Sequence, residues 1–208
     1  MFINHIDFIY PCVTTWGVGR SVAYTGYDAR VEEKAVEGDV ESFTVANAGL
    51  TVYNGGKSIT SGSVSKYRYA VVGTNYNSPA EEGSWSFTID EDKDGDERVI
   101  VGFTTNPELK AGEKYTQDCL FFYRGYNQCV YSGGKKGRKI VAADKGDIVK
   151  FTLDEGDVSI SIRGQDQGVC FKGVEGEIWP FVGTYGKKRA VTLSDIFVGA
   201  IEAPMHGE

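Results

Sequence analysis

The 208-residue sequence predicts an all-β protein, a two-sheet antiparallel sandwich with at most one short helix. Many short stretches alternate apolar with polar residues in period two, which is the pattern of half-buried strands. The chain has 27 glycines and only five prolines, so tight turns are expected between the strands. Short, evenly spaced strands separated by such turns are typical of sandwiches, and this length fits one such domain.

The first 40 residues carry the weakest structural signal. Alternating apolar residues near the start indicate a strand, and residues 28–38 could form one short helix because an Asp cap and a Gly stop enclose them. We therefore expect an N-terminal extension or flanking strands at 1–40, the sandwich at 41–200 and a tail at 201–208.

Strand patterns follow one another from Gly38 onward. Residues 149–153 and 158–162 are the clearest pair, since apolar side chains alternate with polar ones on both sides of a short turn, which indicates a β-hairpin. Asn54 and the two glycines after it are another strong turn signal. Further strands are expected at 38–45, 50–53, 67–72, 85–89, 99–103, 120–123, 129–131 and 189–198.

The order of these motifs resembles a SPRY domain over roughly residues 43–197. The resemblance is clearest in the second half, where a Gly-Asp strand, a Val-Ser-Ile strand, a Gly-Val-Cys-Phe strand and a Trp-Pro strand follow one another between Gly146 and Leu193. Earlier landmarks are the Ala-Val-Val-Gly at 70–73 and the Val-Gly-Phe-Thr at 101–104. The family often has Asn-Gly where this chain has Arg163 and a glycine, so the turn type there could differ.

The resemblance implies a SPRY-type sandwich that works as a non-catalytic protein-protein interaction module. Such domains read a peptide segment of a partner protein with loops at the sandwich edge, and a substrate-recruiting adaptor is one role that this implies. Carried over by position, three loops are candidates: one after the Ala-Val-Val-Gly landmark, one in the central hairpin and one after the Trp-Pro strand. Their residues are Thr74, Asn75, Tyr76, Tyr123, Arg124, Tyr126, Thr184, Tyr185, Gly186 and Lys187.

Tyr and Arg suit such a site because they combine apolar area with directed hydrogen bonds. Each tyrosine could equally fill its loop without contacting a partner. Val72 stands where the family often has an arginine, which weakens the case for a carboxylate clamp there.

An alternative function is a lectin-like sandwich that binds carbohydrate by stacking sugars on Trp and Tyr faces, with the acidic turn at 90–97 as a candidate calcium site. Asp90, Asp92 and Asp94 have the alternate spacing of a calcium loop, with a glycine at the sixth position. The twelfth position is Val101 instead of the bidentate Glu, and no helix is expected on either side. A solvated hairpin turn explains the same residues.

Catalytic chemistry finds no support in the sequence. His5 and His206 are the only histidines, so neither a histidine-based triad nor a zinc site is expected, and no cofactor is implied. The cysteines Cys12, Cys119 and Cys129, together with Cys170, form no Cys-x-x-Cys pair. Free thiols are expected, with a Cys119–Cys129 bridge across a hairpin as the alternative.

Charge and composition narrow the partners. Acidic residues outnumber basic ones by 29 to 22, and the net charge of −7 argues against a nucleic-acid partner. Basic clusters at 135–139 and 187–189 could bind nucleic acid or an acidic peptide, although solvated loops explain them equally well. The N-terminus lacks the features of a signal peptide or a membrane span. We therefore expect a cytoplasmic or otherwise intracellular protein whose partner is a protein or peptide, with no membrane partner.

Overall fold

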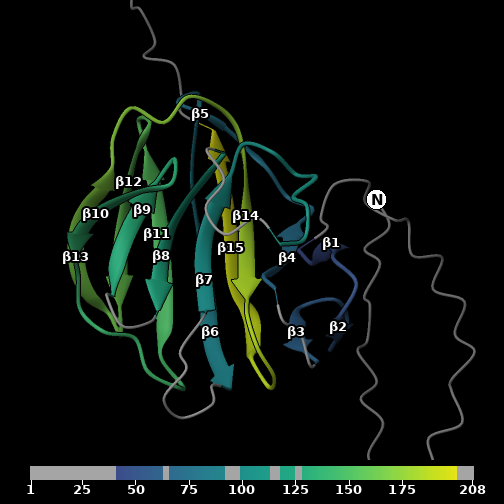
Figure 1. Ribbon diagram of the computed structural model, residues 1–208. Helices are drawn as coiled ribbons and strands as arrows, with labels where there is room; N and C mark the ends of the chain where they lie inside the picture. The colour runs from purple at the N-terminus through teal and green to yellow at the C-terminus, as the bar shows by residue number, and fades with distance from the viewer. Residues whose placement is uncertain (1–40, 63–65, 92–98, 113–117, 125–127, 201–208) are drawn as a thin grey trace, which may run out of the picture. The chain divides into compact units, whose positions relative to one another are not determined.

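The computed structural model describes residues 41–62, 66–91, 99–112, 118–124 and 128–200. These residues form two antiparallel sheets packed face to face (Figure 1), which confirms the predicted all-β sandwich. The described ranges contain no helix, and so none long and apolar enough to cross a membrane. The suggested helix at 28–38, the extension at 1–40 and the tail at 201–208 lie outside these ranges.

Sheet A contains eight strands. Seven of these strands are hydrogen-bonded side by side in the order β1, β4, β14, β7, β8, β9, β10. The eighth strand, β5, pairs with the first part of β14. The strand bounds are β1 (Phe43–Ala46), β4 (Arg68–Val72), β5 (Tyr76–Ser78), β7 (Val99–Thr104), β8 (Cys119–Arg124), β9 (Cys129–Ser132), β10 (Lys135–Lys139) and β14 (Gly176–Thr184).

Sheet B contains seven strands in the order β13, β12, β11, β6, β15, β3, β2. The strand bounds are β2 (Leu50–Tyr53), β3 (Ser58–Ser61), β6 (Glu81–Glu91), β11 (Ile148–Asp154), β12 (Asp157–Ile162), β13 (Gln165–Phe171) and β15 (Ala190–Ala200). The hairpin of β11 and β12 and the turn between β2 and β3 stand where the sequence predicts them.

The main core lies between the two sheets, where alternate residues of each strand point inward. Every second residue of β11 and β12 is buried there, as their period-two pattern predicts. Trp85 of β6 occupies the centre: its ring stacks on Phe151 at 5.5 Å and meets Phe103 edge-on at 5.7 Å. Trp85 is fully buried, so this packing stabilises the contact between the sheets.

A second apolar cluster lies on the outer face of sheet A. Tyr69, Phe121 and Phe181 belong to it, whereas their strand neighbours point into the main core. Leu109, from the segment after β7, packs into this cluster. The segment is held there by hydrogen bonds from Gly112 N to Tyr67 O and from Asn47 Nδ2 to Leu109 O, each 2.9 Å. Sheet A is therefore apolar on both faces.

The turn between β12 and β13 corrects one expectation. Arg163 has φ of 55° and Gly164 has φ of 74°, so both residues are left-handed, as a type I′ turn requires. Arginine therefore makes the same turn that Asn-Gly would make. Its guanidinium lies beside Asp147, with Nε 3.5 Å from Oδ2, and this contact helps to hold the unusual backbone.

Two further outcomes concern the basic cluster at 135–139 and the cysteines. The cluster forms the edge strand β10, not a loop, with every residue exposed. Cys119, Cys129 and Cys170 are free thiols, as expected. The Cys119–Cys129 bridge does not form, because Cys129 pairs with Tyr123 near the end of β8 while Cys119 begins that strand. Cys12 lies outside the described residues.

Candidate functional site

The antiparallel register of sheet A brings two of the three candidate loops to one end of the sandwich. Thr184, the last residue of β14, pairs with Arg68 at the start of β4 and with Val99 at the start of β7. Val99 also pairs with Arg124, the last residue of β8. The chain therefore leaves β14 and β8 on either side of β7, about 10 Å apart. We call this the exit-loop end; it is the lower end in Figure 1.

The third candidate loop lies at the opposite end, so the three loops do not converge. It follows Val72 at the far end of β4 and leads into β5, where Tyr76 pairs with Ile178 in the first part of β14. The length of β4 separates the two ends by about 16 Å. Thr74 and Asn75 are partly exposed there, and Asn75 Nδ2 approaches Glu177 Oε1 at 3.5 Å.

Tyr76 and Thr184 do not fit the partner-binding role that the sequence analysis gives them, because both side chains are fully buried. The Tyr76 ring lies 5.0 Å from that of Trp85, and its hydroxyl donates a hydrogen bond to Ser84 O at 3.0 Å. Burial raises the pKa of the Tyr76 phenol well above its usual value. Both residues therefore belong to the framework.

Ser61 holds the loop that leaves β14 in one conformation. Its Oγ donates to Gly186 O at 2.9 Å and accepts from Arg189 N at 3.0 Å. Its backbone N–H donates to Arg189 O at 2.8 Å, and its backbone carbonyl accepts from Lys188 N at 3.0 Å. Gly186 and Lys188 are left-handed, with φ of 88° and 55°, which turns the chain sharply around the serine. Four bonds to one residue make this exit loop rigid before any partner binds.

Tyr185 is the aromatic residue that this loop offers to a partner. Its side chain is half-buried, and its ring packs against that of Tyr67 at 5.5 Å. Tyr67 in turn stacks on Tyr69 at 6.3 Å, so Tyr185 extends the outer apolar cluster to the sandwich edge. An aromatic ring that is packed in place and partly exposed can anchor a peptide side chain at low entropic cost.

The charge of the exit loop is positive. Lys187 and Lys188 are exposed, and Arg189 is fully buried beneath them. The Arg189 guanidinium donates from Nη1 to Lys187 O at 3.2 Å. The buried arginine thus supports the loop from inside, while the two lysines remain available to acidic groups of a partner.

The structure describes only some of the remaining predicted site residues. Tyr123 and Arg124 belong to the end of β8 and not to a loop. Tyr126 lies outside the described residues, as do Asp92 and Asp94. Asp90 is the last but one residue of β6 and accepts a hydrogen bond from Thr192 Oγ1 at 2.5 Å. The described residues contain no group of three or more potential metal ligands.

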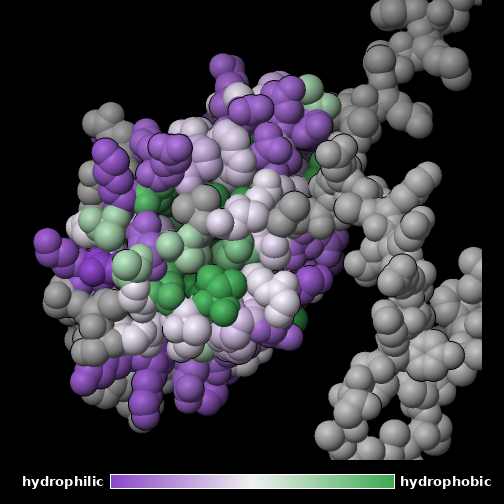
Figure 2. Space-filling view, turned by 90° about the vertical axis from the view of Figure 1, so that its right-hand side faces the viewer, coloured by the Kyte–Doolittle hydropathy of each residue, from purple (hydrophilic) through white to green (hydrophobic). Residues whose placement is uncertain are grey.

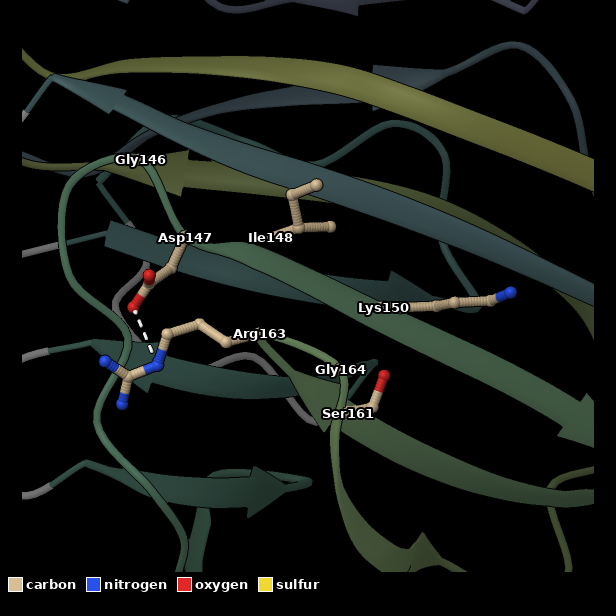
Figure 3. A pocket seen from close by; sticks show the side chains of 7 residues that line it. All are labelled: Gly146, Asp147, Ile148, Lys150, Ser161, Arg163 and Gly164. Atoms are coloured by element: carbon tan, nitrogen blue, oxygen red, sulfur yellow. Dashed lines mark ion pairs between the residues drawn. The ribbon is translucent and has the colours of Figure 1, made fainter.

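A shallow hollow of about 300 Å³ lies on the outer face of sheet B (Figure 3). Figure 3 shows Arg163 turned toward Asp147 while Lys150 extends away from this pair. Ser161 also lines the hollow, but no histidine or cysteine does. An ion pair that holds a turn is a structural arrangement, so nothing in this hollow activates a nucleophile.

Sequence reasoning missed three residues of the exit-loop end: Ser61, Tyr67 and Arg189. Ser61 acts through its register beside the loop, and register between distant strands leaves no local signal. Tyr67 did carry a signal, because it alternates with Tyr69 in the stretch 67–72 that is predicted as a strand. Two tyrosines on one face indicate a second packed surface.

Comparison with known proteins gives a consistent result. Residues 59–195 match the protein family described as Neuralized. No curated protein is found to be similar to the sequence. The SPRY domain of human HERC1 is similar in structure, with a TM-score of 0.61 and 22% identity over 79% of this chain and 98% of that one.

Two further solved structures have the same type of fold. The NEUZ (NHR) domain in Neuralized from Drosophila melanogaster has a TM-score of 0.52 and 18% identity, covering 74% of this chain and 90% of that one. A protein of unknown function with a galectin-like fold from Bacillus subtilis has a TM-score of 0.50 and 14% identity, covering 79% of this chain and 91% of that one. The HERC1 domain confirms the SPRY-type sandwich.

Proposed function

The chain belongs to the Neuralized family, and from this premise we propose that it is a non-catalytic module that binds a peptide segment of a partner protein at the exit-loop end. The main support is the exit loop itself, which four hydrogen bonds to Ser61 hold in place with Tyr185 partly exposed. A rigid aromatic anchor beside two exposed lysines suits a peptide with an apolar side chain next to acidic ones.

Peptides selected from a random library against the full chain would test this function. We expect the selected peptides to lose at least about tenfold in affinity with Tyr185→Ala, the size of effect typical of an interface anchor. Lys187→Glu should weaken acidic peptides further. Asn75→Ala is the matched control, because Asn75 is partly exposed at the opposite end. If Asn75→Ala weakens binding as much as Tyr185→Ala, the site lies elsewhere.

A substrate-recruiting adaptor role extends this proposal: the peptide bound at the exit loop would belong to a protein that the module delivers to other components. Fusing the selected peptide to an unrelated protein should then be sufficient for its recruitment by the full chain. Equal recruitment of the unrelated protein without the fused peptide would contradict the adaptor role.

The carbohydrate-binding alternative has less support. Sugar rings often stack on an exposed tryptophan, but of the tryptophans that the structure describes Trp85 is fully buried and Trp179 is partly buried against the outer cluster. A glycan panel tested with and without calcium would decide between the two functions. The alternative would be favoured if the protein binds a glycan, if calcium strengthens this binding, and if Tyr185→Ala leaves it unchanged.

A further inference from the structure

The edge strand β10 carries an unusual concentration of positive charge. Its sequence is Lys-Lys-Gly-Arg-Lys, and all five residues are exposed. The whole chain has a net charge of −7, so this stripe opposes the charge of the protein. Among the residues that the structure describes, no carboxylate forms an ion pair with Lys135, Lys136 or Lys139.

β10 is the last strand of sheet A, so among the described residues one side of its backbone pairs with no other strand. A two-residue turn of left-handed glycines, with φ of 54° and 76°, joins Ser132 to Lys135, which makes these two a hydrogen-bonded pair. The next pair, Tyr131 with Lys136, is then of the non-hydrogen-bonded type. The N–H and C=O of Lys136 therefore point away from β9, toward the edge of sheet A.

The far end of β10 is fixed to the neighbouring strands. The Arg138 guanidinium donates to Gln167 O of β13, the edge strand of sheet B. Just beyond β10, Val141 N donates to Gln167 Oε1 at 3.1 Å and Ile140 N to Gln128 O at 3.1 Å. Arg138 is thus occupied in joining the two sheets, while the three lysines stay available on a preorganised strand.

Lysines on edge strands often prevent aggregation, and the opposite side of the sandwich shows why that explanation is insufficient here. Figure 2 shows hydrophobic residues gathered in the middle of the face that carries β1 and β2. Val52 and Tyr53 of β2 are 37% and 44% exposed, and β2 contains no charged residue. Protective charge would be expected on that apolar edge, yet the lysines are concentrated on β10.

We propose that β10 docks an extended acidic peptide segment of a partner protein, which adds to sheet A as a further strand. The peptide backbone would pair with the outward N–H and C=O of Lys136. Its carboxylates on one face would lie against Lys136 and Lys139, which pair with Tyr131 and Cys129, and Lys135 would meet acidic groups on the other face. Strand addition supplies affinity through main-chain hydrogen bonds, and charge supplies specificity. A nucleic acid fits less well, because β10 has no aromatic side chain for base stacking and its outward backbone groups match a strand.

This surface is separate from the exit loop. Four strand spacings, about 19 Å, lie between β14 and β10 in sheet A. The inference therefore does not rest on the proposed function, and each can fail without the other.

Fluorescence anisotropy of the full chain with a labelled heptapeptide that alternates Glu and Val tests the proposal. Lys136→Pro and Lys136→Gln remove the same charge, but only proline removes the outward N–H, which β9 does not use. We expect about a threefold loss of affinity with Lys136→Gln and at least about tenfold with Lys136→Pro, the tenfold being close to the contribution of one hydrogen bond. Equal losses would overturn strand addition. Lys187→Gln, at the exit-loop end, should leave the affinity for this peptide unchanged. A tenfold loss with this variant would show that the peptide binds at the exit-loop end and not at β10.

A second measurement keeps the wild-type protein and changes the peptide, so that it does not depend on how a variant folds. N-methylation of alternate peptide amides preserves the charge but removes backbone donors, and we expect the same loss of at least about tenfold. Unchanged affinity would overturn the proposal. So would equal affinity for a charge-matched single-stranded oligonucleotide, which would identify β10 as a general polyanion surface.

Discussion

The two ends of the sandwich are built in different ways (Figure 1). At the upper end, Tyr76 is fully buried and Gly156 O accepts a hydrogen bond from Val174 N at 2.7 Å, so side chains and turns close over the core. At the lower end, Tyr185 is partly exposed and a Cβ added at Gly164 would meet nothing within 4 Å. Packing therefore holds the closed end, whereas hydrogen bonds to one serine hold the exit-loop end. A module can keep a rigid framework at one end and present a shaped surface at the other.

Replacing the tyrosine of each end would test this contrast most strongly. Tyr76→Ala should lower the free energy of unfolding by about 3–5 kcal/mol, because it leaves a cavity beside Trp85 and removes the hydrogen bond to Ser84. Tyr185→Ala should cost about 1 kcal/mol or less, since its ring is partly exposed. Urea unfolding of both variants measures the difference. Similar losses would mean that the two ends are packed alike.

The glycines of the two hairpin turns provide a matched pair. Gly156 and Gly164 have φ of 83° and 74°, so alanine is strained by a similar amount, about 1 kcal/mol, at either position. A Cβ at Gly156 would also lie 3.1 Å from Val174 O and 3.3 Å from Pro79 Cβ, whereas at Gly164 it would meet nothing within 4 Å. Gly156→Ala should therefore cost about 2–3 kcal/mol and Gly164→Ala about 1 kcal/mol. Thermal unfolding of the two variants gives the comparison, and a larger loss for Gly164→Ala would contradict it.

Ser61→Ala should loosen the exit loop while the closed end stays intact. The substitution removes the hydroxyl that bonds Gly186 O and Arg189 N, so we expect a loss of about 1–2 kcal/mol in stability. Amide hydrogen exchange should become faster at Lys188 and Arg189 but stay unchanged in β5. Ser132→Ala, on an exposed serine, is the control. Faster exchange in both regions would show that the ends are coupled.

The sequence predicts the framework well because its signals are local. The alternation of Val149 and Phe151 with polar residues, the short turn and the mirrored alternation after it are enough to define a hairpin and the face that it buries. The ordered series of such hairpins then indicates the SPRY-type sandwich. Each of these inferences uses residues that are close in the chain.

The site is harder to predict because it depends on contacts between distant residues. Tyr76 and Tyr185 look alike in sequence, each an aromatic residue in a loop near glycine, and only the pairing of β14 with β4 and β5 puts them at opposite ends. Ser61 is 125 positions from Gly186 and has no motif of its own. The sequence does not predict the strand β10, because four cations in five residues indicate a solvated loop, although an edge strand exposes such residues equally well.

Alkaline pH should affect the closed end selectively. Burial raises the pKa of Tyr76 above its unfolded value of about 10, so the folded state favours the protonated phenol. The stabilisation that this protonated, buried hydroxyl contributes is complete below pH 10 and decreases above it, by about 1.4 kcal/mol at pH 11. Comparing unfolding of wild type and Tyr76→Phe from pH 8 to 11 isolates this group. A wild-type curve parallel to that of Tyr76→Phe would disprove the effect.

The smallest expected differences come from the non-glycine residues of the same two turns. Glu155 at the closed end and Arg163 at the exit-loop end are both left-handed, with φ of 47° and 55°, and asparagine tolerates this conformation better than either. Glu155→Asn should therefore raise the free energy of unfolding by up to about 1 kcal/mol. Arg163→Asn should gain less, because it also removes the half-exposed contact with Asp147, which contributes at most about 1 kcal/mol. Urea unfolding at low and high salt separates the two contributions, since salt screens only the ion pair. If Arg163→Asn gains more than Glu155→Asn at low salt, the contact with Asp147 does not stabilise the turn, and the exit-loop end tolerates the strain by some other means.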